Sequence, residues 1–310
     1  MSRFLKWLSV LGLTAFILTL IFFISLFGLF SSFLDRGFPQ PYQEKKPHLA
    51  ILALDGPVLQ PDKSLKAIES ISKNAACKGI LVRVNSPGGA VSASQELYKA
   101  LQSLRSDEFP VVVSMGNTAA SGGYYLALGA SRIFANKGTV TGSIGVIAQF
   151  PEMQELFSKI GISMEVIKNG RFKDAGSPFR LSTKEDRECL QRVVDDVYEQ
   201  FIDDILANRD ISREKLLSLA DGRIFTGQQA VSAGLVDTIG GLAQAKNYLV
   251  KVSGLDEDAL FINAGREAHW LDVISSKTGI FKGLVSNRLR GLMKSGLYYL
   301  WPAGISEYAI

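Results

Sequence analysis

Histidine and cysteine are scarce in this 310-residue chain, with two residues of each. Cys77 and Cys189 fit neither a metal site nor a disulfide framework, so they form either a single bridge or two separate buried thiols. The HExxH pattern of metalloproteases is missing, and no pair of carboxylates stands in an evident special environment. The sequence therefore gives no support to metal-dependent or aspartic chemistry, and we expect no metal or other cofactor.

An excess of charge of one sign is also missing. The formal net charge is +4, and the lysines and arginines are scattered rather than clustered, which gives no case for a nucleic-acid partner. No internal repeat occurs at the period of a solenoid. Apolar residues make up 47% of the chain and charged residues 21%, as in a globular α/β protein that carries an additional hydrophobic segment.

That segment is at the N-terminus, where charge is missing altogether from Trp7 to Phe33. The run is longer than the roughly 20 residues that a helix needs to cross a bilayer. Arg3 and Lys6 precede it, whereas the charges that follow it at 35 and 36 cancel. We therefore expect an uncleaved signal anchor with a cytoplasmic N-terminus and an extracytoplasmic remainder, periplasmic in a Gram-negative cell. The alternative is a cleaved signal peptide, but its apolar region normally has only about 7–15 residues and ends in a small-x-small site.

The chain divides into four predicted segments: the signal anchor at 1–35, a proline-rich juxtamembrane linker at 36–48, a main domain at 49–255 and a tail at 256–310. In the main domain short apolar strands alternate with helices, which indicates an α/β fold with largely parallel pairing. Strands are expected at 51–54, 79–85, 110–115, 132–135, 144–149 and 163–167. Helices are expected at 92–104, 152–160 and 228–233 and from about residue 121.

Two further helices are indicated by periodicity. Ser182 and Glu185 form a capping box at the start of the longest one, whose apolar residues recur at helical spacing as far as Ile205. We assign it no chemistry. In the tail, apolar residues recur at helical spacing between 281 and 293, with basic residues mainly elsewhere. A membrane-surface helix, an oligomer contact and an ordinary packing helix all remain open for this stretch.

Two loops carry candidate chemistry. The first, NSPGG, follows the strand at 79–85, and the N–H groups of its glycines, Gly88 and Gly89, can point at a ligand without side-chain obstruction. A tight turn is the alternative. The second holds Ser121 between a strand and a helix, where the N–H of Gly122 and one from the glycine pair can hold an oxyanion. An N-cap is the alternative for Ser121.

A nucleophilic serine needs a base, and neither histidine is well placed. His48 falls in the linker and His269 in the tail, so a Ser-His-Asp triad is not expected. A lysine can act as the base if it is desolvated, because burial disfavours its charged form. Lys173 lies in a glycine-containing loop after the strand expected at 163–167. From composition alone, a lysine in such a loop is expected to be a solvated surface charge.

Five motifs change this interpretation: NSPGG, MGNTAASGGYYLA, TVTGSIGV, GRFKDAGSPFR and DGRIFTGQQAVSAGLVDTIGG. In this order, over residues 49–252, they resemble the signal peptide peptidase A family of membrane-anchored serine peptidases. The resemblance implies a Clp protease/crotonase-like fold with repeated ββα units and a Ser/Lys dyad of Ser121 and Lys173. It also implies oxyanion donors at Gly122 and at one of the NSPGG glycines, of which we favour Gly89 over Gly88. Ser143, in TGSIGV, matches a serine that orients the lysine amine.

The resemblance is to the short, single-copy form of the family. It implies a ring-like homo-oligomer in which the lysine reaches the serine of a neighbouring subunit. The substrates it implies are remnant signal peptides and other small hydrophobic peptides at the membrane. Two alternatives remain: a crotonase-like acyl-CoA hydratase or isomerase, which does not explain the anchor or the Lys173 segment, and a membrane-held scaffold that binds peptides without cleaving them.

Overall fold

A computed structural model describes residues 19–23, 25, 46–264 and 297–300. The chain forms two units, one of residues 1–41 and 266–284 and the other of residues 42–265 and 285–310. In the first unit the described residues, 19–23 and 25, are helical. Across the described ranges, no helix combines the length and apolarity needed to cross a bilayer. Most of the predicted anchor, His269 and the predicted tail helix lie outside these ranges.

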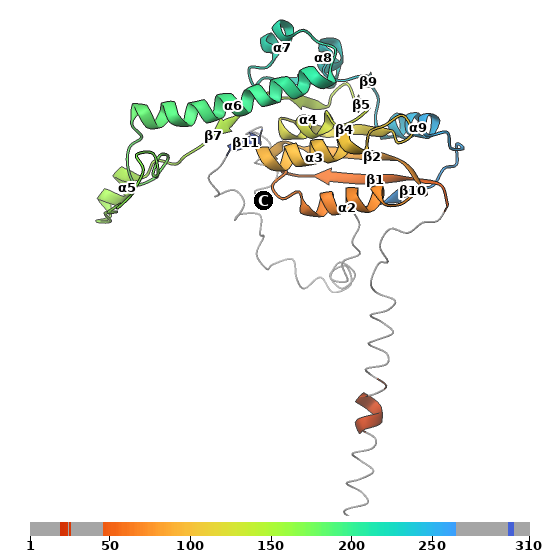
Figure 1. The fold of residues 1–310 in the computed structure, drawn as a ribbon, viewed down its shortest axis with the longest axis horizontal. Helices are drawn as coiled ribbons and strands as arrows, with labels where there is room; N and C mark the ends of the chain where they lie inside the picture. The colour runs from red at the N-terminus through yellow and green to blue at the C-terminus, as the bar shows by residue number, and fades with distance from the viewer. Residues whose placement is uncertain (1–18, 24, 26–45, 265–296, 301–310) are drawn as a thin grey trace, which may run out of the picture. The chain divides into compact units, whose positions relative to one another are not determined.

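The second unit is built on an eight-stranded sheet (Figure 1), and the predicted α/β fold is confirmed. The main path runs β10 (Phe261–Asn263), β1 (His48–Asp55), β2 (Cys77–Ser86), β4 (Val111–Ala120), β5 (Arg132–Ala135) and β9 (Thr238–Ile239). Every pair on this path is parallel. Off the path, β6 (Val140–Gly142) pairs in parallel with β4 and antiparallel with β8 (Ile224–Thr226).

Both faces of the sheet are covered, which explains the near-continuous apolar runs of the central strands. Alternate residues such as Val82 and Val113 belong to a core shared with α3 (Val91–Leu104), α4 (Gly122–Ala127) and α6 (Lys184–Asn208). Residues of the opposite parity, such as Leu81 and Val112, pack with α9 (Leu242–Ser253). Three further helices of this unit are α2 (Asp62–Ser72), α7 (Arg213–Leu219) and α8 (Gly227–Ala233).

A second, smaller sheet includes the glycines of the NSPGG loop. Its order is β3 (Gly88–Ala90), β11 (Leu297–Leu300) and β7 (Ile147–Ala148), and both pairs are antiparallel. The middle strand therefore comes from the C-terminal part of the chain, far in sequence from its two neighbours. Like β10, it continues the sheet structure past the predicted boundary at 255.

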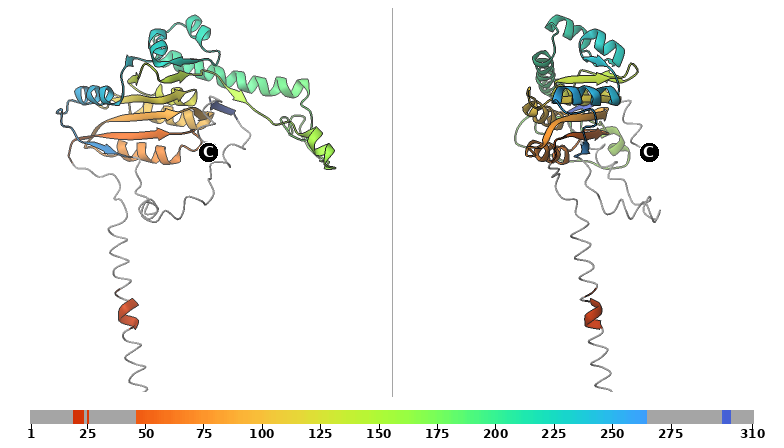
Figure 2. Two further views of the ribbon diagram at one scale, coloured as in Figure 1. Left: turned by 180° about the vertical axis from the view of Figure 1, so that it is seen from behind. Right: turned by 90° about the vertical axis from the view of Figure 1, so that its right-hand side faces the viewer.

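Residues 149–183 form an arm between β7 and α6. In Figures 1 and 2 the arm and its helix α5 (Gln154–Lys159) lie at the far end of α6, away from the main sheet. The arm exposes many large apolar side chains: Leu156, Ile160, Ile162, Met164, Val166, Ile167, Phe172 and Leu181. The arm thus places an apolar surface away from the main core.

Several local predictions are wrong. The expected strand at 163–167 has no regular structure, because in the described part of the chain it finds no neighbouring strand to accept its backbone hydrogen bonds. Only Ile147–Ala148 of the expected strand at 144–149 is extended in a sheet. The capping box of α6 uses Thr183 and Asp186, one residue later than expected. Both cysteines are free, which leaves the alternative of two separate thiols, one of them buried.

His48 also departs from its predicted place in the linker. It is the first residue of β1 and is fully buried. Its Nδ1 lies 2.6 Å from the carbonyl oxygen of Lys46. His48 nevertheless stands at the N-terminal end of its strand, whereas ligands in parallel sheets bind at the C-terminal ends. The position of His48 therefore does not make it a candidate base for Ser121.

Candidate active site

Ser121 occupies a strained junction between β4 and α4. Its φ is 53° and its ψ is −117°, a region that costs a non-glycine residue on the order of 1–3 kcal/mol. The Ser121 N–H donates to the carbonyl of Gly142 at 2.7 Å, and the Ser121 carbonyl accepts from the N–H of Tyr125 at 2.8 Å. The side chain makes no capping hydrogen bond, although Ser121 is only 1% exposed. The hydroxyl of Ser121 therefore takes no part in capping α4.

The helix that follows holds this strain in place. All six residues of α4 are buried. The Tyr124 hydroxyl donates to the Leu235 carbonyl at 2.9 Å, and the Tyr125 hydroxyl donates to the Asp204 carboxylate on α6. The ring of Phe201, also on α6, lies 4.6 Å from the ring of Tyr125. Burial raises the pKa of Tyr124 to about 12, so this hydroxyl stays a neutral donor at physiological pH.

Ser143 lies beside this junction. Ala120 and Gly142 are paired residues of the parallel strands β4 and β6, so the residues that follow them, Ser121 and Ser143, leave the sheet at the same edge. Ser143 is the other non-glycine residue with positive φ in the described part of the chain, at 51°, and it is buried. Its N–H donates to the Arg223 carbonyl at 2.8 Å. The fold thus brings these two predicted site residues together.

The glycine loop approaches the same edge from β2. Ser86 is paired with Ala119, and its carbonyl oxygen would lie 2.8 Å from a Cβ built on Gly123 in the first turn of α4. The Gly88 N–H donates to Ser86 Oγ at 3.1 Å, which occupies it. The backbone of this loop therefore packs directly against the start of the helix that follows Ser121.

The N–H groups of the two loop glycines differ in direction. The Gly88 carbonyl accepts from Val58 and the Ala90 N–H donates to Val58, each at 2.8 Å. Because peptide groups alternate along a strand, the N–H of Gly89 faces the opposite edge, where β11 pairs. This edge accepts an extended backbone: Tyr299 is the register partner of Gly89, and Leu297 is the partner of Ala148 on β7.

Two side chains that support the backbone of the candidate site were not predicted from the sequence. Ser86 accepts the Gly88 N–H, as described above. Asn85 Oδ1 accepts the N–H groups of Asn117 and Thr118 at 3.1 and 3.2 Å, and these residues lie in the last part of β4. Both residues precede the glycines in the NSPGG motif. The sequence signal that could have identified them is a polar side chain at the end of a buried strand.

Lys173 lies apart from these residues. It is exposed on the arm, and its N–H donates to the Gly170 carbonyl at 3.2 Å. Among the described residues, none forms a hydrogen bond or ion pair with its amine. The fold of a single chain therefore brings together Ser121, Gly122, Gly89 and Ser143 but not Lys173. No group of three or more metal-binding side chains occurs within the described ranges.

Comparisons with known proteins are consistent with hydrolytic chemistry. The profile of peptidase family S49 matches residues 103–256, and that of Clp protease matches residues 61–140. The chain is 45% identical over 196 residues to a putative protease of Synechocystis sp., which covers 63% of this chain and 69% of that protein. It is 37% identical over 193 residues to a putative signal peptide peptidase SppA of Enterococcus faecium, covering 62% and 56%. It is 33% identical over 245 residues to the chloroplastic serine protease SPPA of Arabidopsis thaliana, covering 78% and 36%.

Proposed function

Because the chain belongs to peptidase family S49, among serine peptidases of the signal peptide peptidase A type, we propose that Ser121 and Lys173 form its catalytic dyad. The observation that carries this proposal is the positive φ of Ser121 at the junction of β4 and α4. Such a junction places a nucleophile beside the unpaired N–H groups of a helix start. The absence of a capping hydrogen bond from the Ser121 side chain weakens the alternative N-cap role.

In the proposed mechanism, neutral Lys173 accepts the hydroxyl proton of Ser121 as Oγ attacks a peptide carbonyl. The N–H groups of Gly122 and Gly89 hold the oxyanion. The resulting ammonium then protonates the leaving amine, and the peptide C–N bond breaks to give an acyl-enzyme. Lys173 next takes a proton from the water that attacks the ester, and it returns this proton to Ser121 Oγ as the acyl C–O bond breaks and the carboxylic acid product leaves. Ser143 orients the lysine amine.

The position of Lys173 supports a site shared between subunits. Lys173 is on the arm, and apolar residues around it are exposed, with Ile167 94% exposed. Closed rings arise when one surface of a subunit meets a different surface of the next. In a ring-like homo-oligomer, the arm of one subunit would bury its apolar residues on a neighbour. It would thereby bring Lys173 to that neighbour's Ser121 and remove water from the amine, which favours its neutral form.

The proposed substrates are small hydrophobic peptides at the membrane, including remnant signal peptides. The pairing of β11 between β3 and β7 supports binding of a substrate as an extended strand, because backbone hydrogen bonds give affinity without demanding one sequence. The uncharged run from Trp7 to Phe33 supports a membrane anchor, and the preceding positive charges support an extracytoplasmic catalytic domain.

Variants of the dyad test the chemistry. We expect Ser121→Ala and Lys173→Ala to lose peptide cleavage while their unfolding temperatures stay close to wild type. Lys173→Arg should be equally inactive, because a guanidinium does not release its proton at working pH. Lys159→Arg, also on the exposed part of the arm, is the matched control and should cleave normally. A Lys173→Arg enzyme with the wild-type rate would refute the dyad. Labelling of Ser121 by a serine-directed phosphonate would exclude a non-catalytic scaffold.

Mixing two inactive variants tests the sharing of sites. Ser121→Ala subunits keep the lysine, and Lys173→Ala subunits keep the serine. When the two are unfolded and reassembled together in equal amounts, a shared site recovers about a quarter of the wild-type activity, because each site draws at random on two neighbouring subunits. A site within one chain recovers none. Reassembled wild-type protein is the control for the yield of refolding.

A further inference from the structure

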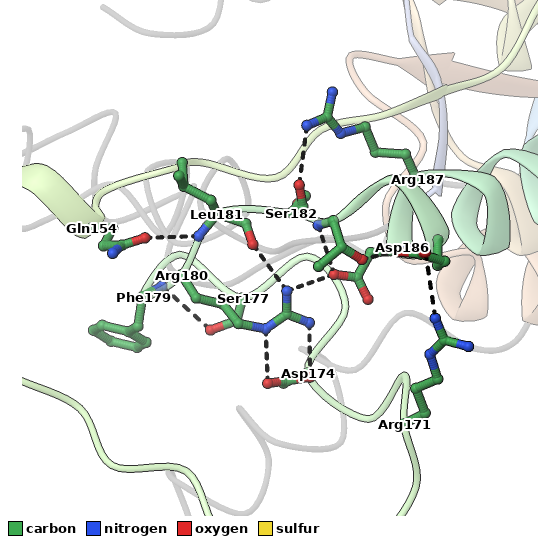
Figure 3. Close-up of polar contacts among 12 residues, drawn as sticks. Gln154, Arg171, Asp174, Ser177, Phe179, Arg180, Leu181, Ser182, Asp186 and Arg187 are labelled. Atoms are coloured by element: carbon green, nitrogen blue, oxygen red, sulfur yellow. Dashed lines mark hydrogen bonds and ion pairs between the residues drawn. The ribbon is translucent and has the colours of Figure 1, made fainter.

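A network of ion pairs fixes the segment that carries Lys173. The guanidinium of Arg180 lies between Asp174 and Asp186 (Figure 3). Its Nε and Nη2 each donate to one oxygen of the Asp174 carboxylate at 2.9 Å. Its Nη1 donates to Asp186 Oδ2 at 2.5 Å and to the Leu181 carbonyl at 3.0 Å. Such a two-pronged contact requires the planar fork of arginine.

Asp186 connects this network to the body of the domain. It is only 3% exposed and completes the capping box of α6, accepting from the Thr183 N–H at 3.0 Å. Arg180 holds the pKa of both carboxyls, Asp174 and Asp186, well below their usual range, and they in turn raise the pKa of Arg180. All three groups therefore stay charged at any pH at which a peptidase works. Arg180 thus ties the arm to the first turn of α6.

Asp174, which Arg180 holds, directly follows Lys173 in the sequence. A carboxylate within a few ångströms of an amine stabilises the ammonium form, which is the wrong form for a base. Here both oxygens of Asp174 are already engaged, by Arg180 and by Lys168. The turn is also closed by its backbone, since the Ser177 N–H donates to the Asp174 carbonyl at 3.0 Å. The carboxylate beside the lysine is therefore neutralised by fixed cations.

We propose that Arg180 is a positioning residue for catalysis, which engages Asp174 so that this carboxylate does not hold Lys173 in its ammonium form. The inference depends on the proposed role of Lys173 as the base. The other charged groups of the arm and of the first residues of α6 are Glu152, Glu155, Lys159, Glu165, Lys168, Arg171, Lys184, Glu185, Asp186, Arg187 and Glu188. Apart from Lys168, none of them contacts Asp174.

The test is the pH dependence of kcat/KM for peptide cleavage by the full-length chain. Arg180→Gln removes a positive charge and releases Asp174 from all but its contact with Lys168, and both changes favour the ammonium form of Lys173. We expect the acidic limb of the profile to move to higher pH by about one unit, which lowers activity on that limb about tenfold. Adding Asp174→Asn to Arg180→Gln removes the released carboxylate as well. The double variant should return the limb toward its wild-type position.

Two controls separate this role from a merely structural one. Arg187→Gln makes the same change of charge at an exposed arginine that donates to the Ser182 carbonyl and not to Asp174, and its limb should stay in place. Arg180→Lys keeps the charge but loses the fork, so it should lower the rate without moving the limb. A uniform loss of activity in Arg180→Gln at all pH values, or a double variant no better than the single, would overturn the inference. Activity in Lys173→Ala would instead overturn the proposed function.

Discussion

Gly89→Ala probes the glycine loop at the point where its backbone has least room. A Cβ built on Gly89 lies 2.0 Å from the carbonyl oxygen of Val58, 2.5 Å from its carbonyl carbon and 2.6 Å from its nitrogen. All three are backbone atoms, so no rotation of a side chain relieves the contact. Real Cβ atoms essentially never approach other heavy atoms closer than 3.0 Å. The two segments must therefore separate by about 1 Å or more.

That separation has two costs. Overpacking of a closed site costs about 1–3 kcal/mol, and the two hydrogen bonds between Val58 and the loop are strained in addition, at about 1 kcal/mol each. We expect the free energy of unfolding to fall by about 3–5 kcal/mol, and the unfolding temperature of a domain of this size by roughly 6–20 °C. The same movement displaces the N–H of Gly89, and a misplacement of about 1 Å at a reacting centre costs on the order of 100-fold in rate.

Thermal unfolding and steady-state peptide cleavage, measured on the same preparation, separate the two costs. Gly138→Ala is the matched control, because a Cβ at Gly138 meets nothing within 4 Å, and it should leave both quantities unchanged. Assays well below the lowered unfolding temperature show the catalytic loss in folded protein. A Gly89→Ala enzyme with the unfolding temperature and kcat/KM of the Gly138→Ala control would refute both the packing argument and the assignment of Gly89 as an oxyanion donor.

Two further predictions concern the ends of the chain. Deleting residues 297–310 removes β11 from the edges of β3 and β7, so the KM for added peptides should fall while kcat holds, and an unchanged KM would show that β11 does not compete with substrate. Protease added to intact spheroplasts should digest the domain that follows residue 36, because the charges before the apolar run predict an extracytoplasmic domain; protection until the membrane is lysed would contradict this topology.

The parts of the fold that could be predicted are those whose cause is local. Residues 79–85 and 132–135 form strands as expected, because buried parallel strands have continuous apolar sequences. The extension of β4 through Gly116 to Ala120 was missed, since its composition is poor for a strand. It is extended because Asn85 Oδ1 accepts two of its N–H groups and β6 pairs with its end. Both causes are tertiary contacts and have no local sequence signal.

The same distinction holds for the candidate site. A serine between a strand and a helix is visible in the sequence, and the structure has Ser121 at that junction. Its positive φ is not visible, because it depends on the buried contacts of Tyr124 and Tyr125 with residues about 80 to 110 positions away. The pair Asp174 and Arg180 was equally hidden, since a spacing of six residues is not that of a helical pair and the two residues lie in a stretch of turns.

Helix α6 supports both halves of the proposed dyad and also keeps them apart within one chain. Near its middle, Phe201 and Asp204 hold the helix that follows Ser121. At its start, Asp186 holds Arg180 and thereby the turn that carries Lys173. Eighteen residues separate Asp186 from Asp204, which corresponds to about 27 Å along a straight helix. A lysine side chain spans only a fraction of that distance. Because α6 is continuous between these points, bending the arm back would break the contacts that hold one half or the other, which supports the proposal that Lys173 meets the serine of a second subunit.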